Sequence, residues 1–595
     1  MVCEGEGGIP GRGSTYPMTS RPKRSVKFGA ILMSLGYLTL CFGGESAKPF
    51  ATIDDTRYEV SVEGTGDTQQ RFIVDSGQKL LIKGNDDKSV SLIGTDGTEV
   101  RKIAPGGLKS DADRSNVLVF ILLLGLSLVT IGNGFFKPNI STIVGTLYDE
   151  GDRRRDAGFT IFYMGINLGS LISQFFCPLL AVAVGWWAGF GLAALGMACS
   201  WALFQFDGGR LKGFGERPAD APLNRDWHIY GGALIAIPVV LFLFWNLMNY
   251  VAPPPGSGIL GYVLLLPIMG KFLFGTFLIG VPAILAWSYL KGSRTEFQMM
   301  LAAMVLIVFN VVFWTLFEQA GSSLTLFAER NTVLEIGWTV PLFAAFRSMP
   351  FTYYLFFGAW SGGVAWLAWW FFSNGEEPQT KRIMAIGFGI FAVLSMIGMH
   401  VARLNGFGSQ PVYVMPAGQT QIFNALFIVI LAPIFSFIWN GLANRGLEPS
   451  IPVKFGLALM GVGAGFLFLV WGAGFANSSY QVGLAWLAGL YLIHSVAELC
   501  ISPVGLSMIT KLSIARIVGL MMGVWFLSIS VAQYVAGAVA QVASVETVGG
   551  QVTNLKVSLE TYIGVFTTIG WISVGIGIVL LLLSWPLKYL MHGVK

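Results

Sequence analysis

Three ionisable side chains, Lys137, Glu318 and Glu498, lie within strongly apolar stretches of this 595-residue chain. A charge at the centre of a bilayer costs about 2.5–3.5 kcal/mol on insertion scales, so such residues usually line a water-filled path or pair with one another. One cation and two carboxylates on three separate apolar segments predict a cavity that handles protons and a zwitterionic solute. This combination is typical of a coupled transporter.

Two of these residues also have a second interpretation. Lys137 precedes Pro138 near the end of an apolar segment, so its ammonium could instead extend to the membrane surface. Glu318 is followed by a glycine and two serines, so it could lie at the water interface. If Glu318 is buried instead, removal from water raises the pKa of a carboxyl group toward the range of physiological proton exchange.

Polar and aromatic side chains accompany these charges at helical spacing. Tyr163 and Asn167 are four residues apart and share a helix face, where the Asn167 amide needs a partner on a neighbouring helix or a ligand. Trp314 precedes Glu318 by one turn and would place an aromatic wall beside the carboxylate.

The segment around Glu498 carries the clearest polar stripe. His494 lies one turn before Glu498 and Ser502 one turn after it, so all three share a face. A carboxylate there needs a cation, which could be Lys137, a substrate amine or the partner in a purely structural ion pair. Trp525 could wall the same cavity or face lipid.

The composition predicts a polytopic helical membrane protein. Hydrophobic residues make up 54% of the chain and charged residues only 12%, whereas an average soluble domain carries about 25% charged residues. The net charge of +5 lies in loops, which excludes a nucleic-acid-binding surface and points to membrane orientation. Apolar stretches long enough to cross a bilayer recur along the chain. We predict fourteen spans, near residues 27–44, 116–136, 157–182, 184–206, 228–251, 258–291, 296–318, 352–373, 382–402, 421–441, 454–475, 482–504, 515–540 and 561–588.

The distribution of cations predicts the orientation. Lys and Arg cluster in every second short loop, as at 153–155 and 291–294, whereas the loops 183–186 and 476–481 hold almost none. By the positive-inside rule the cationic loops and both termini face the cytoplasm. We therefore expect a multi-pass protein of the inner, cytoplasmic membrane.

Residues 45–115 do not resemble a membrane segment. The runs 58–62 and 79–83 alternate between polar and apolar residues and are separated by Gly-Asn-Asp and Asp-Gly turns, which is typical of β-hairpins. We predict a small β-rich extracytoplasmic insert without disulfides, with a disordered loop as the alternative. The five cysteines show no paired spacing and the histidines are scattered, so we expect no metal or cofactor.

Several ordered motifs together resemble the proton-dependent oligopeptide transporter (POT) family of the major facilitator superfamily. The match extends from about residue 27 to the end, outside the inserts. The motifs are Gly-Asn-Gly-Phe-Phe-Lys-Pro-Asn at 132–139, Gly-Asp-Arg-Arg-Arg-Asp at 151–156, Phe-Tyr-Met-Gly-Ile-Asn-Leu-Gly-Ser at 162–170, Phe-Trp-Thr-Leu-Phe-Glu-Gln-Ala-Gly-Ser-Ser at 313–323, Gln-Ile-Phe-Asn-Ala at 421–425 and Ala-Glu-Leu-Cys-Ile-Ser-Pro-Val-Gly at 497–505.

The resemblance implies a role for each matching residue. Lys137 would attract the peptide's C-terminal carboxylate and would pair with Glu498 in the empty site. Glu498, with Asn167 and Asn424, would hold the α-amino group. Glu318 would bind the coupled proton, and Glu498 and Lys137 would take part in the coupling. The side-chain pockets would be shaped by Tyr163, Trp314, Ser502 and Trp525.

The chain departs from the family pattern in two places. The Glu-x-x-Glu-Arg-Phe motif of the family's opening helix is absent, so the match begins at its third helix. Without that arginine, Glu318 has no expected counter-charge. Residues 335–415 also add about two spans. The predicted fold is thus an all-α polytopic membrane protein of the two-bundle major-facilitator type, lacking the first two helices and carrying a small β-rich extracytoplasmic insert.

The predicted domain layout follows from these segments. It comprises a cytoplasmic N-terminal segment at 1–26, a first span at 27–44, the insert at 45–115, the rest of the N-terminal bundle at 116–206, a linker and extra hairpin at 207–295, and the C-terminal bundle at 296–595 with an inserted hairpin at about 342–402.

The predicted function is proton-coupled symport of di- and tripeptides into the cell by alternating access. The expected partners are the peptide, protons and the lipid bilayer, with no nucleic acid, and we expect a monomer driven by the proton gradient. One alternative is a symporter of another small solute, and another is a transport-inactive homologue that senses or binds peptides. An enzyme is not expected, because no nucleophile–base pair or metal motif has useful spacing.

Overall fold

The computed structural model describes most of the chain. It covers residues 22–44, 48–63, 70–75, 77–147, 154–206, 226–250, 265–337, 378–404, 412–514, 517–543, 547–548 and 551–594, with isolated positions between 354 and 369. Most of the predicted span 352–373, the start of 258–291 and most of the predicted N-terminal segment therefore lie outside the described residues.

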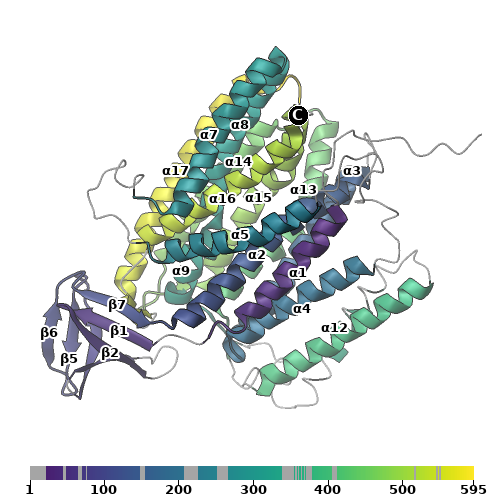
Figure 1. Cartoon of the computed structure of the whole chain (residues 1–595). Coiled ribbons are helices and arrows are strands. Elements are labelled where there is room, and N and C mark those ends of the chain that lie inside the picture. Colours follow the sequence, from purple (N-terminus) through teal and green to yellow (C-terminus); the bar gives the residue numbers. More distant parts are fainter. Residues whose placement is uncertain are drawn as a thin grey trace, which may run out of the picture.

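Long helices dominate the described part of the chain (Figure 1). They are α1 (Pro22–Leu40), α2 (Asn116–Thr146), α3 (Arg154–Ala183), α4 (Trp186–Gln205), α5 (Asp226–Met248), α7 (Ile268–Lys291), α8 (Arg294–Phe317), α9 (Ser323–Asn331), α12 (Pro378–Leu404), α13 (Ile422–Asn444), α14 (Ile451–Ala473), α15 (Leu484–Leu512), α16 (Val518–Val542) and α17 (Leu555–Leu590).

Eleven helices of the described part are long and apolar enough to cross a bilayer. The chain is therefore a polytopic helical membrane protein, as predicted, although the expected spans numbered fourteen. The predicted span 27–44 forms α1, but Lys23, Arg24 and Lys27 crowd its N-terminal third. Helix α12, at the predicted span 382–402, has only a short apolar stretch, Ala385–Leu394.

Local sequence sets where several helices begin. Ser293 accepts a hydrogen bond from the Glu296 amide, and the Glu296 side chain accepts one from the Ser293 amide, which forms a capping box at the start of α8. Pro267 is the N-cap of α7 rather than a kink within a longer helix. The predicted span 258–291 is therefore helical only from Ile268 onward in its described part.

Glycines let two pairs of helices approach closely. A β-carbon at Gly463 of α14 would lie 2.5 Å from the Gly570 carbonyl oxygen of α17, and one at Gly577 would lie 2.9 Å from the Gly456 oxygen. Small residues allow such backbone contact within a membrane, where helices associate mainly by packing. Helices α1 and α2 meet in the same way, at Gly29 with Gly132 and at Gly36 with Gly125.

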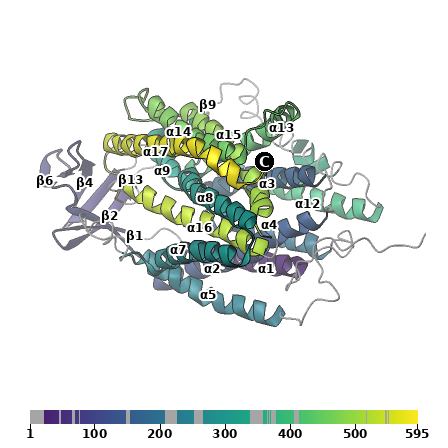
Figure 2. The same ribbon diagram turned by 90° about the horizontal axis from the view of Figure 1, so that it is seen from above.

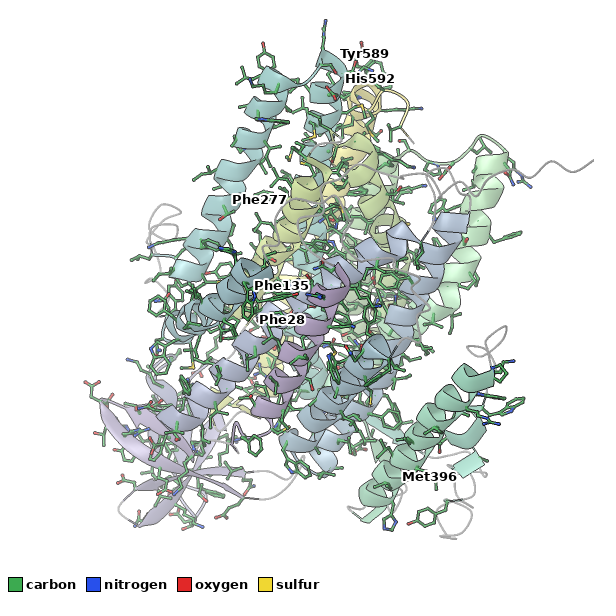
Figure 3. All side chains as sticks on the ribbon, turned by 45° about the vertical axis from the view of Figure 1, so that its right-hand side comes forward. Phe28, Phe135, Phe277, Met396, Tyr589 and His592 are labelled. Atoms are coloured by element: carbon green, nitrogen blue, oxygen red, sulfur yellow. The ribbon has the colours of Figure 1, made fainter. Side chains whose placement is uncertain are left out.

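Aromatic contacts support the same helix pairs. The rings of Phe28 in α1 and Phe135 in α2 meet edge to face with centroids 5.3 Å apart (Figure 3). The largest hydrophobic cluster lies among the C-terminal helices, where Phe327, Phe466 and Phe566 are buried together. The C-terminal half therefore has its own packed core.

The predicted insert is a seven-stranded antiparallel sheet between α1 and α2, which excludes the disordered-loop alternative. Ile73 lies opposite both Val60 and Leu80, and all three are buried in the core of the sheet. The strand order is β6-β5-β4-β3-β2-β1-β7, so the last strand returns beside the first. The strands are β1 (Lys48–Ile53), β2 (Thr56–Glu63), β3 (Gln70–Asp75), β4 (Gln78–Gly84), β5 (Val90–Ile93), β6 (Glu99–Ile103) and β7 (Leu108–Asp113).

The sheet projects from one end of the helical body, and Figure 2 shows this from above. Tyr589, in the last turn of α17, and His592, just after that helix, lie at the opposite end of the molecule from the sheet (Figure 3). Short two-stranded ladders join loops elsewhere, at β8 (Thr332–Val333) with β11 (Val482–Gly483), β9 (Glu335–Gly337) with β10 (Val412–Val414), and β12 (Thr547–Val548) with β13 (Gln551–Val552).

Candidate functional site

Glu498 is a buried carboxylate at the meeting point of three helices. It lies on α15 with only 8% of its surface exposed. Its Oε1 accepts a 2.7 Å hydrogen bond from the Tyr163 hydroxyl of α3, and its Oε2 accepts a 3.1 Å bond from Asn424 Nδ2 of α13. Among the described residues no cation lies within ion-pair distance, so neutral donors hold this carboxylate.

The side chain of Asn424 is fixed by a second acceptor. Its Nδ2 also donates to Ser495 Oγ at 3.0 Å, and Ser495 in turn donates to the Tyr491 carbonyl at 2.8 Å. Ser495 is fully buried. The sequence analysis missed Ser495, although a serine three residues before Glu498 shares its helix face.

Asn167 is buried beside this site but does not reach Glu498. Its Nδ2 donates 3.0 Å back to the Tyr163 carbonyl within α3. This bond matches neither the helix-to-helix contact nor the ligand contact that the spacing suggested. In this conformation Asn167 therefore satisfies its amide nitrogen locally.

Glu318 lies at a break within a long membrane segment. Helix α8 ends at Phe317, a 3-10 turn runs from Glu318 to Gly321, and α9 continues to Asn331. The candidate span covers Arg294–Asn331, so Glu318 lies inside it rather than at its end. Gln533 of α16 donates a 3.1 Å hydrogen bond to Glu318 Oε1. This partner was not predicted, although an amide in the apolar α16 was the available signal.

Lys137 lies within electrostatic range of Glu318. Helix α2 continues beyond Lys137 to Thr146, although its candidate membrane span ends at Lys137. Within the described part of the chain, no ion pair joins Lys137 to Glu498. The Glu498 carboxylate instead accepts hydrogen bonds from the neutral donors Tyr163 and Asn424.

A cavity of about 160 Å³ is lined by Glu318 and by Asn424, the residue that donates to Glu498. It has room for several water molecules, each of which takes about 30 Å³ in the liquid. Gln174, from α3, brings a residue of the N-terminal half to this cavity. The lining residues are Gln174, Phe317, Glu318, Ala320, Gly321, Gln421, Asn424, Tyr491 and His494.

The remaining predicted residues surround these two groups. His494 is buried, with Nε2 3.1 Å from the Val462 carbonyl oxygen, whereas Ser502 is half-buried. Trp525 is 3% exposed and covers Gly505 of α15, which excludes the lipid-facing alternative.

Two aromatic side chains lie just before the 3-10 turn that begins at Glu318. The rings of Trp314 and Phe317 meet edge to face at 5.3 Å, one turn and one residue before Glu318. In the described ranges no three His, Cys, Asp or Glu side chains come together as a metal site requires.

Comparison with known proteins gives a consistent family match. The family model PTR2, the POT family, matches residues 25–216 and 409–555. A di-/tripeptide transporter of Lactococcus lactis subsp. cremoris is 29% identical over 484 residues, which cover 80% of this chain and 77% of that protein. The peptide transporter YePEPT of Yersinia enterocolitica subsp. palearctica is 28% identical over 430 residues, which cover 70% of this chain and 67% of that protein.

A solved structure has the same fold. It is a crystal structure of a peptide transporter POT in complex with sulfate, with a TM-score of 0.57 and 23% sequence identity. The alignment covers 96% of this chain and 82% of that one. The helices described above therefore form the two-bundle arrangement of major-facilitator transporters.

Proposed function

Because this chain belongs to the POT family, whose model matches more than half of it, we propose that it is a proton-coupled symporter of di- and tripeptides. The similarity to a di-/tripeptide transporter of Lactococcus lactis supports the peptide substrate. The observation that carries the proposal is the buried Glu498 carboxylate, held by neutral donors from two other helices.

Glu498 is suited to bind the α-amino group of a peptide. Tyr163 and Asn424 hold the carboxylate through hydrogen bonds but do not neutralise its charge. A buried charge is costly without a counter-ion, so a substrate ammonium would gain from pairing there. The carboxylate can accept the ammonium while both neutral donors stay in place, since each oxygen accepts more than one hydrogen bond.

Lys137 and Glu318 are suited to couple the proton to the peptide. The two groups attract each other in the empty site. Protonation of Glu318 would remove a negative charge within electrostatic range of Lys137 and so favour binding of the peptide's C-terminal carboxylate by the ammonium. Gln533 would keep the Glu318 side chain in position in either state, because an amide can donate to the ionised form and accept from the protonated one.

The transport cycle would be alternating access around this central site. Glu498 and Asn424 lie in the C-terminal half and Tyr163 in the N-terminal half, so relative movement of the halves changes the same contacts that bind the peptide. We further propose an inner-membrane location, cytoplasmic termini, a monomer and no cofactor besides the proton gradient. The insert would then face the extracytoplasmic side.

Uptake of a labelled dipeptide into vesicles tests this function. The reconstituted protein should accumulate the dipeptide when an inward proton gradient is imposed, and unlabelled dipeptides should compete. Glu498→Ala should abolish uptake at every pH. The proposal fails if the wild-type protein binds dipeptides without gradient-stimulated flux, or if Glu498→Ala transports like the wild type.

A further inference from the structure

The β-sheet insert belongs to the first half of the chain but contacts the second half. It is connected to α1 and α2, yet its β4–β5 turn lies against the start of α17. The Gly84 amide donates to the Thr553 carbonyl oxygen at 3.2 Å. A β-carbon at Gly84 would lie 2.5 Å from that oxygen, so only glycine permits this approach.

Two side chains of the α17 segment complete the contact. Asn554 Nδ2 donates to Asp86 Oδ1 at 3.1 Å and to the Gly84 carbonyl at 3.4 Å. Lys556 Nζ forms an ion pair with Asp86 Oδ2 at 2.7 Å. The turn and this segment therefore fit each other through both shape and charge.

The turn itself is held in a fixed shape. The Asn85 amide donates to the Ser89 carbonyl at 2.8 Å, and the Asn85 side chain donates to Ser89 and Ser91. Asp87 accepts from the Ser89 amide at 3.0 Å. These bonds hold the backbone on both sides of Asp86.

Each side of the contact is anchored in its own half. Strand β7 ends at Asp113 and α2 begins at Asn116, so the sheet can move little relative to α2. On the other side, Asn331 at the end of α9 donates to the Leu555 carbonyl at 3.0 Å, and Ser558 donates to Asn331 Oδ1 at 2.7 Å. The start of α17 is thus fixed to the C-terminal helices.

We propose that the insert is an internal docking domain that holds the two halves together at its own membrane face. Its turn 84–88 binds the segment 553–556 and so links α2 to α17 outside the membrane. A contact between the halves near the same face supports this: Gln419, before α13, donates a 2.6 Å hydrogen bond to the Phe175 carbonyl of α3. Opening the central cavity toward the insert face requires the docking contact to break.

The docking contact itself does not depend on the proposed function. Only its expected effect on transport rests on the proposed alternating access. The docking contact can be tested without a peptide, in the full-length protein with its five native cysteines replaced. The pair Asp86→Cys and Asn554→Cys should react with a short bifunctional thiol reagent, because the Gly84–Thr553 contact remains in this variant. The control pair Asp96→Cys and Asn554→Cys should not, since the Asp96 turn lies at the opposite end of β5.

Cysteine labelling tests whether docking restrains the cavity. Gln174→Cys places a thiol at the cavity wall, and a membrane-impermeant reagent added from the insert face reports its exposure. Gly84→Leu should increase the labelling rate, because the added side chain displaces Thr553. Lys556→Ala should increase it by about two- to fivefold, the range expected for loss of one exposed ion pair.

Two further variants separate docking from folding. Asn554→Ser keeps an oxygen that can cap α17 at Lys556 and Val557, but it removes the amide that reaches Asp86. It should raise labelling, whereas Glu63→Gln, which breaks an ion pair within the sheet, should not. The inference is overturned if the two cysteine pairs cross-link equally, or if Gly84→Leu and Asn554→Ser both label at the parent rate. Absence of dipeptide uptake with these labelling changes intact would count against the proposed function instead.

Discussion

The Tyr163 hydroxyl donates a 2.7 Å hydrogen bond to Glu498, a residue 335 positions away in the sequence, and thereby joins two helices. Tyr163 belongs to α3 in the N-terminal half, whereas Glu498 belongs to α15 in the C-terminal half. A bond to a charged group contributes about 1.5–3 kcal/mol. The contact between the halves at the centre of the molecule is therefore part of the proposed amine site itself.

Tyr163→Phe should weaken peptide binding. The change removes the hydroxyl that donates to Glu498 Oε1 from α3, so the ionised form of Glu498 is less well stabilised. We expect KM for a dipeptide to rise roughly tenfold to 100-fold. Uptake kinetics in vesicles measure this, with Tyr37→Phe on α1 as the control. Equal KM values for the two variants would contradict the role of this bond.

Lys137→Gln should abolish discrimination between a dipeptide and its C-terminal amide. If the ammonium binds the peptide carboxylate, the wild-type protein prefers the free acid by about tenfold or more, and the variant binds both equally. Competition against a labelled dipeptide gives the ratio. Lys271→Gln on the exposed face of α7 is the matched control and should keep the preference. An unchanged preference in Lys137→Gln would exclude Lys137 from carboxylate binding.

Glu318→Gln should uncouple peptide movement from the proton gradient. The amide keeps the shape and the contact with Gln533 but cannot take up a proton. For one proton per peptide, the wild type can accumulate substrate up to about tenfold for each pH unit of gradient, and the variant should only equilibrate it. Exchange of internal for external dipeptide should persist. Glu329→Gln, exposed on α9, should accumulate peptide normally. Gradient-driven accumulation by Glu318→Gln would overturn this assignment.

Gly577→Val should destabilise the C-terminal half. A β-carbon there would lie 2.6 Å from Met460 Cγ and 2.9 Å from the Gly456 carbonyl oxygen, so α14 and α17 must separate. Overpacking of this kind costs about 1–3 kcal/mol. Thermal unfolding of the purified protein in detergent should detect the loss. Gly575→Val, two residues away with open space around it, should unfold nearly like the wild type.

Docking of the insert should not change between pH 5 and 8. The hydrogen bond from Lys556 lowers the pKa of Asp86 below its ordinary value of about 3.9. A lowered pKa stabilises the docked state above the ordinary value, and this contribution is lost as pH falls through the lowered pKa. Hydrogen-exchange protection of the Gly84 amide should thus stay constant from pH 8 to 5 and decrease below about pH 4.

The Gly107 amide, which donates to the Ala104 carbonyl in the β6–β7 turn, serves as the internal control for that measurement because residues 104–107 hold no carboxylate. The protection of this amide, measured relative to its intrinsic exchange rate, should stay constant with pH. If the protection of the Gly84 amide were lost with a midpoint between pH 5 and 8, a group other than Asp86 would control docking.

The sequence by itself determined the membrane class, the β insert and the chemical character of the site. Apolar stretches of about 20 residues are sufficient to predict membrane helices, because each helix satisfies its backbone hydrogen bonds internally. Alternating residues and glycine turns predicted a strand at 58–62, which lies within β2 (Thr56–Glu63). Rare charges at membrane depth identified Glu318 and Glu498 before any contact was known.

Only the tertiary structure decided which groups meet. The sequence suggested Lys137 or a substrate amine as the partner of Glu498, whereas in the structure Tyr163 and Asn424 bind the carboxylate and Lys137 lies within electrostatic range of Glu318. Gln533, Ser495 and the docking of the insert on α17 were likewise not predicted. Such contacts join positions far apart in the chain, and helical spacing specifies the face of a side chain but not the neighbour that packs against it.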